Sequence, residues 1–125
     1  MSALTFLLVD DFAVARMQLR ALIDNLPSCQ VIGEAGDGYE AIQMVHRLHP
    51  NVILLDVSMP GINGIQVTKR IKREKPDTHI IIYSAYNIPL IKQRALKAGA
   101  DAYFDKSELE HTVIAALVSQ WLGIN

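Results

Sequence analysis

The chain has 125 residues, which is enough for one compact domain and little more. Half of its residues are hydrophobic and 20% are charged, a composition that excludes an intrinsically disordered segment. The net charge of -1 gives no overall basic field for nucleic acid, and no uncharged apolar run approaches the roughly 18 residues of a membrane span.

The N-terminus and the cysteine content bear on the compartment. Residues 1–4 lack the basic start and the long apolar stretch of a signal peptide. Cys29 is the only cysteine, so an internal disulfide is excluded. We therefore expect a reduced, cytoplasmic setting.

The first expected strand–helix unit opens the chain. A short apolar strand is expected over Phe6–Val9. An amphipathic helix follows and closes at Asn25 and Pro27. Its apolar stripe recurs at three- and four-residue steps and consists of Phe12, Ala15, Leu19, Leu22 and Leu26.

Two further units follow the same alternation. A strand over Gln30–Gly33 precedes a helix that stops before Pro50 and whose apolar stripe consists of Ala41, Ile42, Val45 and Leu48. A strand over Val52–Leu55 precedes a third helix, which begins after Asn63-Gly64 and is marked by Val67 and Ile71.

The last two units complete the pattern. The fourth strand is expected over His79–Tyr83, and its helix contains Ile91, Ala95 and Ala98 and ends at Gly99, a good left-handed cap residue. The fifth strand is expected over Ala102–Phe104. Residues 107–110 have the spacing of a capping box, which predicts that the fifth helix begins there.

Five strand–helix units predict a three-layer α/β fold in a single domain, residues 1–125, with helices on both faces of a five-stranded parallel sheet. Several of the strands are short, continuous and rich in Val and Ile, as buried parallel strands are. We expect the flavodoxin-like strand order 2-1-3-4-5. In such sheets, functional groups gather at the carboxyl ends of the strands.

Polar side chains stand at four of these strand ends. Asp10 and Asp11 follow the first strand, Asp56 ends the third, Ser84 ends the fourth and Lys106 follows the fifth. A single aspartate at a strand end is more often a turn or cap residue. The five together at one edge of the sheet favour a functional site.

This set of groups suits phosphoryl chemistry. Clustered carboxylates repel one another, and a hard divalent cation removes the repulsion; we expect Mg²⁺, with Mn²⁺ as an alternative. The ammonium adds positive charge, the hydroxyl can donate a hydrogen bond, and one carboxylate is available as a nucleophile. Phosphoryl transfer needs chiefly such alignment and charge neutralisation.

Several segments resemble the receiver domain of bacterial response regulators in two-component signalling, over essentially the whole chain. They are Leu8–Phe12, Val52–Gly61, Ser84–Ala85 and Lys97–Tyr103. Residues 33–38 are similar to the second-strand segment of receivers from regulators with helix-turn-helix outputs. The opening segment is similar to the single-domain chemotaxis regulator.

The resemblance implies roles for the acidic groups. Asp56 would accept a phosphoryl group from a phosphohistidine of a sensor histidine kinase or phosphotransfer protein. Asp11 would bind Mg²⁺ directly, and Asp10 would bind it directly or through water. The main-chain carbonyl of Ser58 would be a further ligand.

The resemblance also implies a switch. Lys106 would contact the bound phosphoryl group, the hydroxyl of Ser84 would move toward it, and Tyr103 would turn inward. The surface of the fourth helix, fifth strand and fifth helix would then change and control an output partner or a downstream domain. One departure is Ser107, where many receivers have a cis proline. A cis bond there is disfavoured without proline, by about 2.5–4 kcal/mol.

Three other patterns receive structural interpretations. The basic run Lys69–Lys75 is interpreted as the solvated end of the third helix, so we expect this domain itself to bind no nucleic acid. His46 and His49 are interpreted as exposed or capping residues, because no third metal ligand lies near them in the sequence. Gly36–Gly38 is interpreted as a turn into a helix rather than a dinucleotide loop.

The last helix is apolar on two sides. One row holds Ile114, Val118 and Leu122, and the opposite row runs from Leu109 to Gln120. Either the helix lies deep in the fold or one row is covered from outside. We interpret Ile114, Val118 and Leu122 as the outer row, available to a second subunit or to a downstream domain.

Three other functions compete with the switch. A phosphatase or phosphotransferase with an aspartyl nucleophile should turn over phosphate esters. A flavin or nucleotide module should have a phosphate cradle, but the first strand is followed by Asp-Asp-Phe-Ala. A receiver-like domain that signals without phosphate should lack the acceptor or the lysine, and both are present here.

Overall fold

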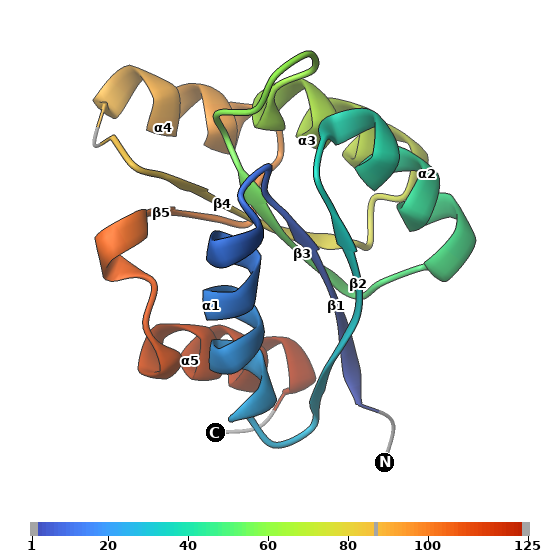
Figure 1. Ribbon diagram of the computed structural model, residues 1–125, viewed down its shortest axis with the longest axis vertical. Helices are drawn as coiled ribbons and strands as arrows, with labels where there is room; N and C mark the ends of the chain where they lie inside the picture. The colour runs from blue at the N-terminus through green and yellow to red at the C-terminus, as the bar shows by residue number, and fades with distance from the viewer. Residues whose placement is uncertain (1–2, 87, 124–125) are drawn as a thin grey trace.

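The computed structural model describes residues 3–86 and 88–123. Five strands and five α-helices alternate along the chain, with a short 3-10 helix before the last α-helix (Figure 1). The strands are β1 (Leu4–Val9), β2 (Cys29–Ala35), β3 (Val52–Asp56), β4 (His79–Ser84) and β5 (Ala102–Asp105). The helices are α1 (Ala13–Asp24), α2 (Gly38–Leu48), α3 (Gly64–Glu74), α4 (Pro89–Lys97), η1 (Lys106–Glu108) and α5 (His111–Leu122).

The five strands form one parallel sheet in the order β2-β1-β3-β4-β5, which confirms the predicted fold class and strand order. The outer residues of the predicted domain, 1–2 and 124–125, lie outside the described residues. Within 3–86 and 88–123, no helix combines the length and the hydrophobicity that crossing a bilayer requires.

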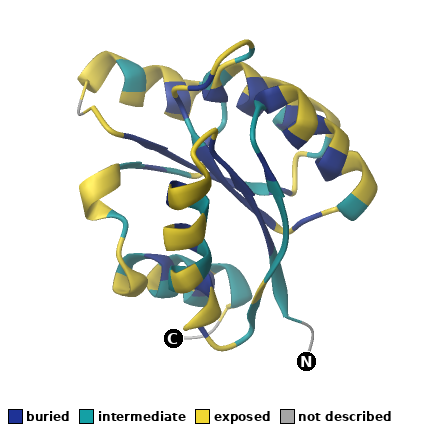
Figure 2. Cartoon of the chain, viewed as in Figure 1, coloured by how far each residue is buried: buried dark blue, intermediate teal, exposed yellow. Residues whose placement is uncertain are grey.

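Two apolar layers hold the sheet between the helices, because strand side chains alternate between its faces. Leu7, Val9, Ile53 and Leu55 pack under α2, α3 and α4. Residues of the other parity, such as Phe6, Leu8 and Leu54, pack under α1 and α5. Figure 2 shows the buried residues concentrated in the central strands and on the inner sides of the helices.

The first helix starts later than its apolar pattern predicted. Phe12 is its N-cap residue and is 67% exposed, so it does not belong to the buried stripe. Ile23 is fully buried instead, and Leu22 is only partly buried. The pattern therefore identified the helix correctly but included an exposed residue.

The start of the last helix was also predicted incorrectly. The capping box lies two residues earlier than expected: Asp105 accepts a hydrogen bond from Ser107 N at 2.9 Å, and Glu108 accepts one from Asp105 N at 2.9 Å. These bonds stabilise the short helix η1, and α5 begins only at His111.

The predicted outer face of α5 is wrong. Ile114 is fully buried and Val118 is 5% exposed, and both pack on the sheet, while Leu122 is partly buried against the same core. At the far end of α5, Trp121 stacks on His79 of β4, with ring centroids 4.1 Å apart. Hydrophobic periodicity found two apolar rows but could not determine which row faces the sheet. Because Ile114 and Val118 are buried against the sheet, their row is not available to a second subunit.

Candidate functional site

The register of the sheet brings the polar strand ends to one level. Val9 of β1 pairs with Leu55 of β3, so Asp10 lies level with Asp56. Asp56 pairs with Tyr83, and Ser84 pairs with Asp105, the residue before Lys106. The predicted polar residues therefore all lie at the carboxyl ends of the parallel strands, on the same edge of the sheet.

Three carboxylates meet at this edge. Asp10, Asp11 and Asp56 each offer an oxygen, and these oxygens lie within 4.8 Å of one another. Asp10 is fully buried, Asp56 is half-buried and Asp11 is exposed. An all-oxygen acidic cluster open on one side suits a hard divalent cation that keeps some of its water.

Asp10 is held on both of its carboxylate oxygens. Oδ1 accepts a hydrogen bond from Phe12 N at 2.9 Å, and Oδ2 accepts one from the hydroxyl of Tyr83 at 2.6 Å. The guanidinium of Arg16 donates to the main-chain carbonyl of Asp10 at 2.5 Å. Sequence reasoning missed Tyr83, although its hydroxyl after the aliphatic run Ile80–Ile82 was a visible signal.

An ion-pair group on α1 and β2 holds Arg16 in turn. Arg16 Nε lies 2.9 Å from Glu34 Oε1, and Arg20 lies 2.6 Å from Glu34 Oε2. The hydrogen bond from Arg20, together with that from Arg16, lowers the pKa of Glu34. No local pattern in the sequence connects β2 to the site, so these three residues could not be predicted.

The environment of Asp56 makes its ionisation unfavourable without a cation. Burial, followed by the nearby charges of Asp10 and Asp11, raises its pKa to about 6. A hydrogen bond from Ser58 N, 3.1 Å from Asp56 Oδ1, and the charge of Lys106 act in the opposite direction. A bound cation would stabilise the ionised carboxylate that a nucleophile requires.

Lys106 stands at the start of η1, directly after β5. Its peptide bond to Ser107 is trans, as the absence of proline predicted. Among the described residues, Lys106 forms no ion pair with Asp56 within 4.0 Å. The exposed ammonium nevertheless contributes positive charge near Asp56 and acts to lower its pKa.

Ser84 and Tyr103 lie beneath the edge on the α3 and α4 side. Ser84 is fully buried, and its hydroxyl accepts a hydrogen bond from Tyr86 N at 3.1 Å. Tyr103 is 8% exposed and packs with Ile82 and Ala95. Within the described residues, the Tyr103 hydroxyl has no hydrogen-bond partner. Its ring thus points inward.

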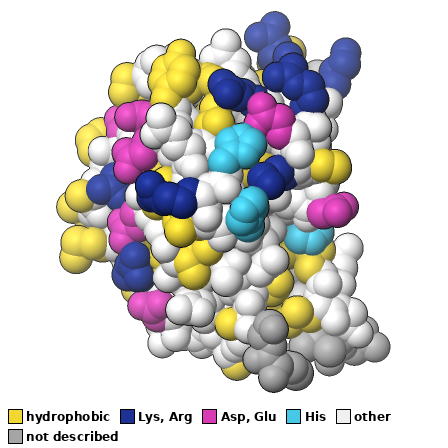
Figure 3. Space-filling view, turned by 90° about the vertical axis from the view of Figure 1, so that its right-hand side faces the viewer, with side chains coloured by type: hydrophobic (Ala, Val, Ile, Leu, Met, Phe, Trp, Pro, Cys, Tyr) yellow, Lys and Arg dark blue, Asp and Glu magenta, His cyan; other side chains and the backbone are white. Residues whose placement is uncertain are grey.

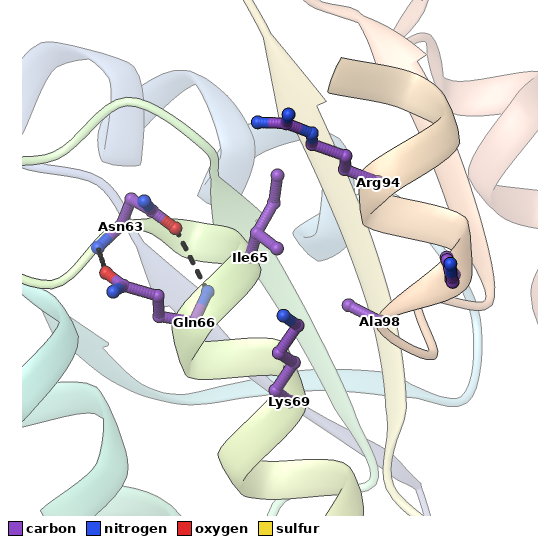
Figure 4. Close-up of a pocket in the computed structure, with 7 residues that line it drawn as sticks. Asn63, Ile65, Gln66, Lys69, Arg94 and Ala98 are labelled. Carbon is purple, nitrogen blue, oxygen red and sulfur yellow. Dashed lines mark hydrogen bonds between the residues drawn. The ribbon is translucent and has the colours of Figure 1, made fainter. Parts of the chain in front are cut away.

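The loop after Asp56 borders a groove between α3 and α4. A hollow of about 560 Å³ is lined by Ser58, Met59, Pro60 and neighbouring residues. It shares Asn63, Ile65 and Arg94 with a second hollow of about 490 Å³ (Figure 4). Asn63 and Gln66 exchange two hydrogen bonds at the start of α3, which confirms the predicted helix start and fixes one wall of the groove.

The two histidines interpreted as exposed or capping residues have such places in the structure. His46 lies 2.7 Å from Glu74, which also pairs with Arg70, and His49 is the left-handed cap residue of α2. The pairings with His46 and Arg70 lower the pKa of Glu74. In the view of Figure 3, Lys and Arg side chains gather toward the upper right corner. Elsewhere on the face shown, they are mixed with acidic and histidine side chains.

The comparisons with known proteins identify the domain. Residues 6–118 match the model of the response regulator receiver domain. The nitrate/nitrite response regulator protein NarL of Escherichia coli K12 is 34% identical over 90% of this chain and 52% of its own length. The transcriptional regulatory protein LiaR of Bacillus subtilis is 40% identical over 81% of this chain and 48% of its own length. The chain thus spans about half the length of these relatives.

Solved structures give the same result. The response regulator domain of Thermotoga maritima CheB has a TM-score of 0.81 and 34% identity, covering 97% of this chain and 95% of that one. The isolated REC domain of Salmonella enterica RcsB, determined with the phosphomimetic BeF3-, has a TM-score of 0.87 and 25% identity, covering 99% and 92%. The chain therefore belongs to the response regulator receiver domains of two-component signalling systems.

Proposed function

We propose that this domain is a phosphorylation-dependent switch in which Asp56 accepts a phosphoryl group in the presence of Mg²⁺, or of Mn²⁺ in its place. The observation that carries the proposal is the cluster of Asp10, Asp11 and Asp56, whose oxygens lie within 4.8 Å of one another on two neighbouring strands. The same register pairs Ser84 with Asp105, so that Lys106, the next residue, follows β5 at this edge.

The cluster fits the metal that the family uses. Asp11 and Asp56 would hold the cation directly, Asp10 would hold it directly or through water, and the main-chain carbonyl of Ser58 would add an oxygen. The raised pKa of Asp56, caused by burial and by the two neighbouring carboxylates, indicates negative charge that is not fully compensated. When bound, Mg²⁺ supplies positive charge to the carboxylates and to the phosphoryl oxygens.

Asp56 performs the chemical step. One of its carboxylate oxygens attacks the phosphorus of a phosphohistidine on a sensor kinase or phosphotransfer protein. The P–O bond to Asp56 forms as the P–N bond breaks, and the departing imidazole nitrogen takes a proton from water. Lys106 neutralises charge on the transferred group, and Asp10 and Asp11 would hold the cation, which would supply further positive charge there.

The chain offers a surface for a protein donor. Phe12, Val14 and Met17 are each at least 65% exposed and lie at the start of α1, next to Asp11. We propose that the protein carrying the donor histidine contacts these side chains when the histidine approaches Asp56. Exposed apolar groups of this kind favour a protein partner.

Signal output follows from Ser84 and Tyr103. The Ser84 hydroxyl would leave Tyr86 N and bond to the phosphoryl group, and Tyr103 would repack below it. The changed surface would be α4, β5 and α5, where Ile88, Leu90 and Leu96 are already exposed. By analogy with LiaR, named a transcriptional regulatory protein, we propose that this surface controls a DNA-binding output, while the receiver itself binds no nucleic acid.

Acetyl phosphate provides a direct test. Incubation of the purified chain with acetyl phosphate and Mg²⁺ should add the mass of one phosphoryl group, measured on the intact protein. The adduct should be absent with EDTA and in Asp56→Asn. Lys106→Met should reduce it severalfold, because charge on the transferred group would be left unneutralised.

A matched control is Asp77→Asn, which removes an exposed carboxylate in the turn before β4, at the end of the strand opposite to the site, and should leave the adduct intact. Phosphorylation that persists in Asp56→Asn, or that proceeds equally with EDTA, would contradict the proposal. Sustained turnover of phosphate esters would favour the aspartyl-nucleophile enzyme instead.

A further inference from the structure

Tyr83 is an unusual residue in its strand. It follows three isoleucines in β4 and is only 1% exposed. Side chains alternate along a strand, so Tyr83 and Ser84 point to opposite faces of the sheet. Tyr83 lies in the layer with Phe6 and Leu8, below the end of β1. An aliphatic side chain would suit that layer, but it would lack the hydroxyl.

The hydroxyl of Tyr83 reaches the acidic cluster. It donates to Asp10 Oδ2 at 2.6 Å, across 73 positions of sequence. Asp10 is fully buried, so water is poorly placed to replace this donor.

Two donors on two oxygens determine the rotation of the Asp10 carboxylate. Phe12 N holds Oδ1 at 2.9 Å, and Tyr83 holds Oδ2. Phe12 N belongs to the backbone directly after Asp11. Tyr83 lies on β4, which pairs with β3, the strand that ends in Asp56. With either donor removed, the carboxylate could turn about its Cβ–Cγ bond.

We propose that Tyr83 is a positioning residue of the metal site, which acts on the bound cation only through Asp10. This inference rests on the proposed function, because it concerns the cation that the three carboxylates would hold. A carboxylate already fixed toward Asp11 and Asp56 loses little freedom on binding a cation. Partners that orient metal ligands typically change metal affinity by about 10–100-fold when they are removed.

Metal affinity of the free protein tests the inference without any phosphorylation. Electron paramagnetic resonance of free Mn²⁺ gives its dissociation constant, and competition gives that of Mg²⁺. Tyr83→Phe, which removes only the hydroxyl oxygen, should weaken the binding of both cations at least tenfold. Tyr39→Phe is the matched control, because it removes the same hydroxyl from a residue on α2 that is 60% exposed. This variant should bind both cations as tightly as wild type does.

A double-mutant cycle separates positioning from a general structural role. In the Asp10→Ala background, Tyr83→Phe should cause no further loss of Mn²⁺ affinity, because the carboxylate through which it acts is gone. A further tenfold loss there would overturn the inference. If Tyr83→Phe melts below the assay temperature, the titrations of wild type and variant are repeated at a lower temperature at which both are folded.

The outcomes distinguish this inference from the proposed function. Wild-type protein that binds neither Mn²⁺ nor Mg²⁺ would contradict the proposed function itself. Wild-type binding with unchanged or tighter binding in Tyr83→Phe would overturn the positioning role alone. Weaker binding in Tyr83→Phe, with the wild-type circular dichroism spectrum, supports it.

Discussion

Asp56 is a half-buried carboxylate with two other carboxylates, Asp10 and Asp11, beside it. Burial is the first cause of its raised pKa of about 6, and the charges of Asp10 and Asp11 add to it. In the unfolded chain its pKa returns to the ordinary value of 3.8. The folded chain thus binds the proton more tightly than the unfolded chain does.

The sign of the resulting pH dependence follows from this difference. The contribution of Asp56 to stability is complete below pH 3.8 and is lost as the pH rises through about 6. Above that pH, the metal-free protein carries an ionised, half-buried carboxylate beside two others. The folded state is then less stable than it would be with a neutral group at this position.

We therefore predict that Asp56→Asn raises the melting temperature of the metal-free protein. The increase should be larger at pH 8 than at pH 5, because the wild-type carboxyl is largely neutral at the lower pH. Thermal unfolding with EDTA at both pH values measures it. Asp77→Asn is the control and should show no such difference, and an equal increase at both pH values for Asp56→Asn would contradict the electrostatic explanation.

At the scale of elements, α3 packs closely on the backbone that carries the acceptor. Gly64 is the first residue of α3, and its amide donates to Val57 O at 3.1 Å. A Cβ at Gly64 would lie 2.6 Å from Asp56 O and 2.9 Å from Val57 Cα. Both are backbone atoms, so the contact can be relieved only by moving the helix or the strand end.

Gly64→Ala should consequently destabilise the domain by about 1–3 kcal/mol, the usual cost of overpacking. It should also weaken Mn²⁺ binding, because the displaced backbone carries Asp56. Urea unfolding and Mn²⁺ titration measure the two effects. Gly36→Ala is the control: a Cβ there meets its nearest neighbour, Arg16, only at 3.9 Å. We expect a change within about 0.5 kcal/mol for that variant.

The last helix shows what periodicity can determine for an element. The sequence predicted two apolar rows; Ile114 and Val118 of one row pack in the core, whereas Ala116 and Gln120 of the other row are exposed and Leu117 is only partly buried. The choice of Ile114, Val118 and Leu122 as the outer row was wrong, since Ile114 and Val118 are core residues. A row of side chains has no outer side until the sheet against which the helix packs is in place.

At the scale of the whole molecule, metal binding and folding are coupled. A cation that binds the folded cluster and not the unfolded chain stabilises the fold by RT ln(1 + [L]/Kd). Once Mg²⁺ exceeds its dissociation constant, each tenfold increase should add about 1.4 kcal/mol.

We predict that the melting temperature of wild-type protein rises steadily with the logarithm of the Mg²⁺ concentration. The dependence should be much weaker in Asp11→Asn, which removes an expected direct ligand from an exposed position. Scanning calorimetry at constant ionic strength measures both. The same slope in the two proteins would indicate a general salt effect.

The sequence predicted the order of the backbone elements better than it predicted individual contacts. All five strands and five helices were predicted in the correct order, because buried parallel strands and amphipathic helices leave different periods in the sequence. The three clustered carboxylates were predicted from the rule that parallel strands end at one edge. The capping box at Asp105 was misplaced, because Ser107 and Glu110 have the same spacing in sequence as Asp105 and Glu108.

The sequence by itself determined the element order, the family and which polar side chains follow which strands, since these depend on local pattern and chain connectivity. The tertiary structure alone decided the contacts that join distant segments. It placed the Tyr83 hydroxyl on Asp10, the Glu34 carboxylate on Arg16, and Ile114 in the core. Such contacts depend on strand register and helix rotation, which are fixed only when all the layers pack together.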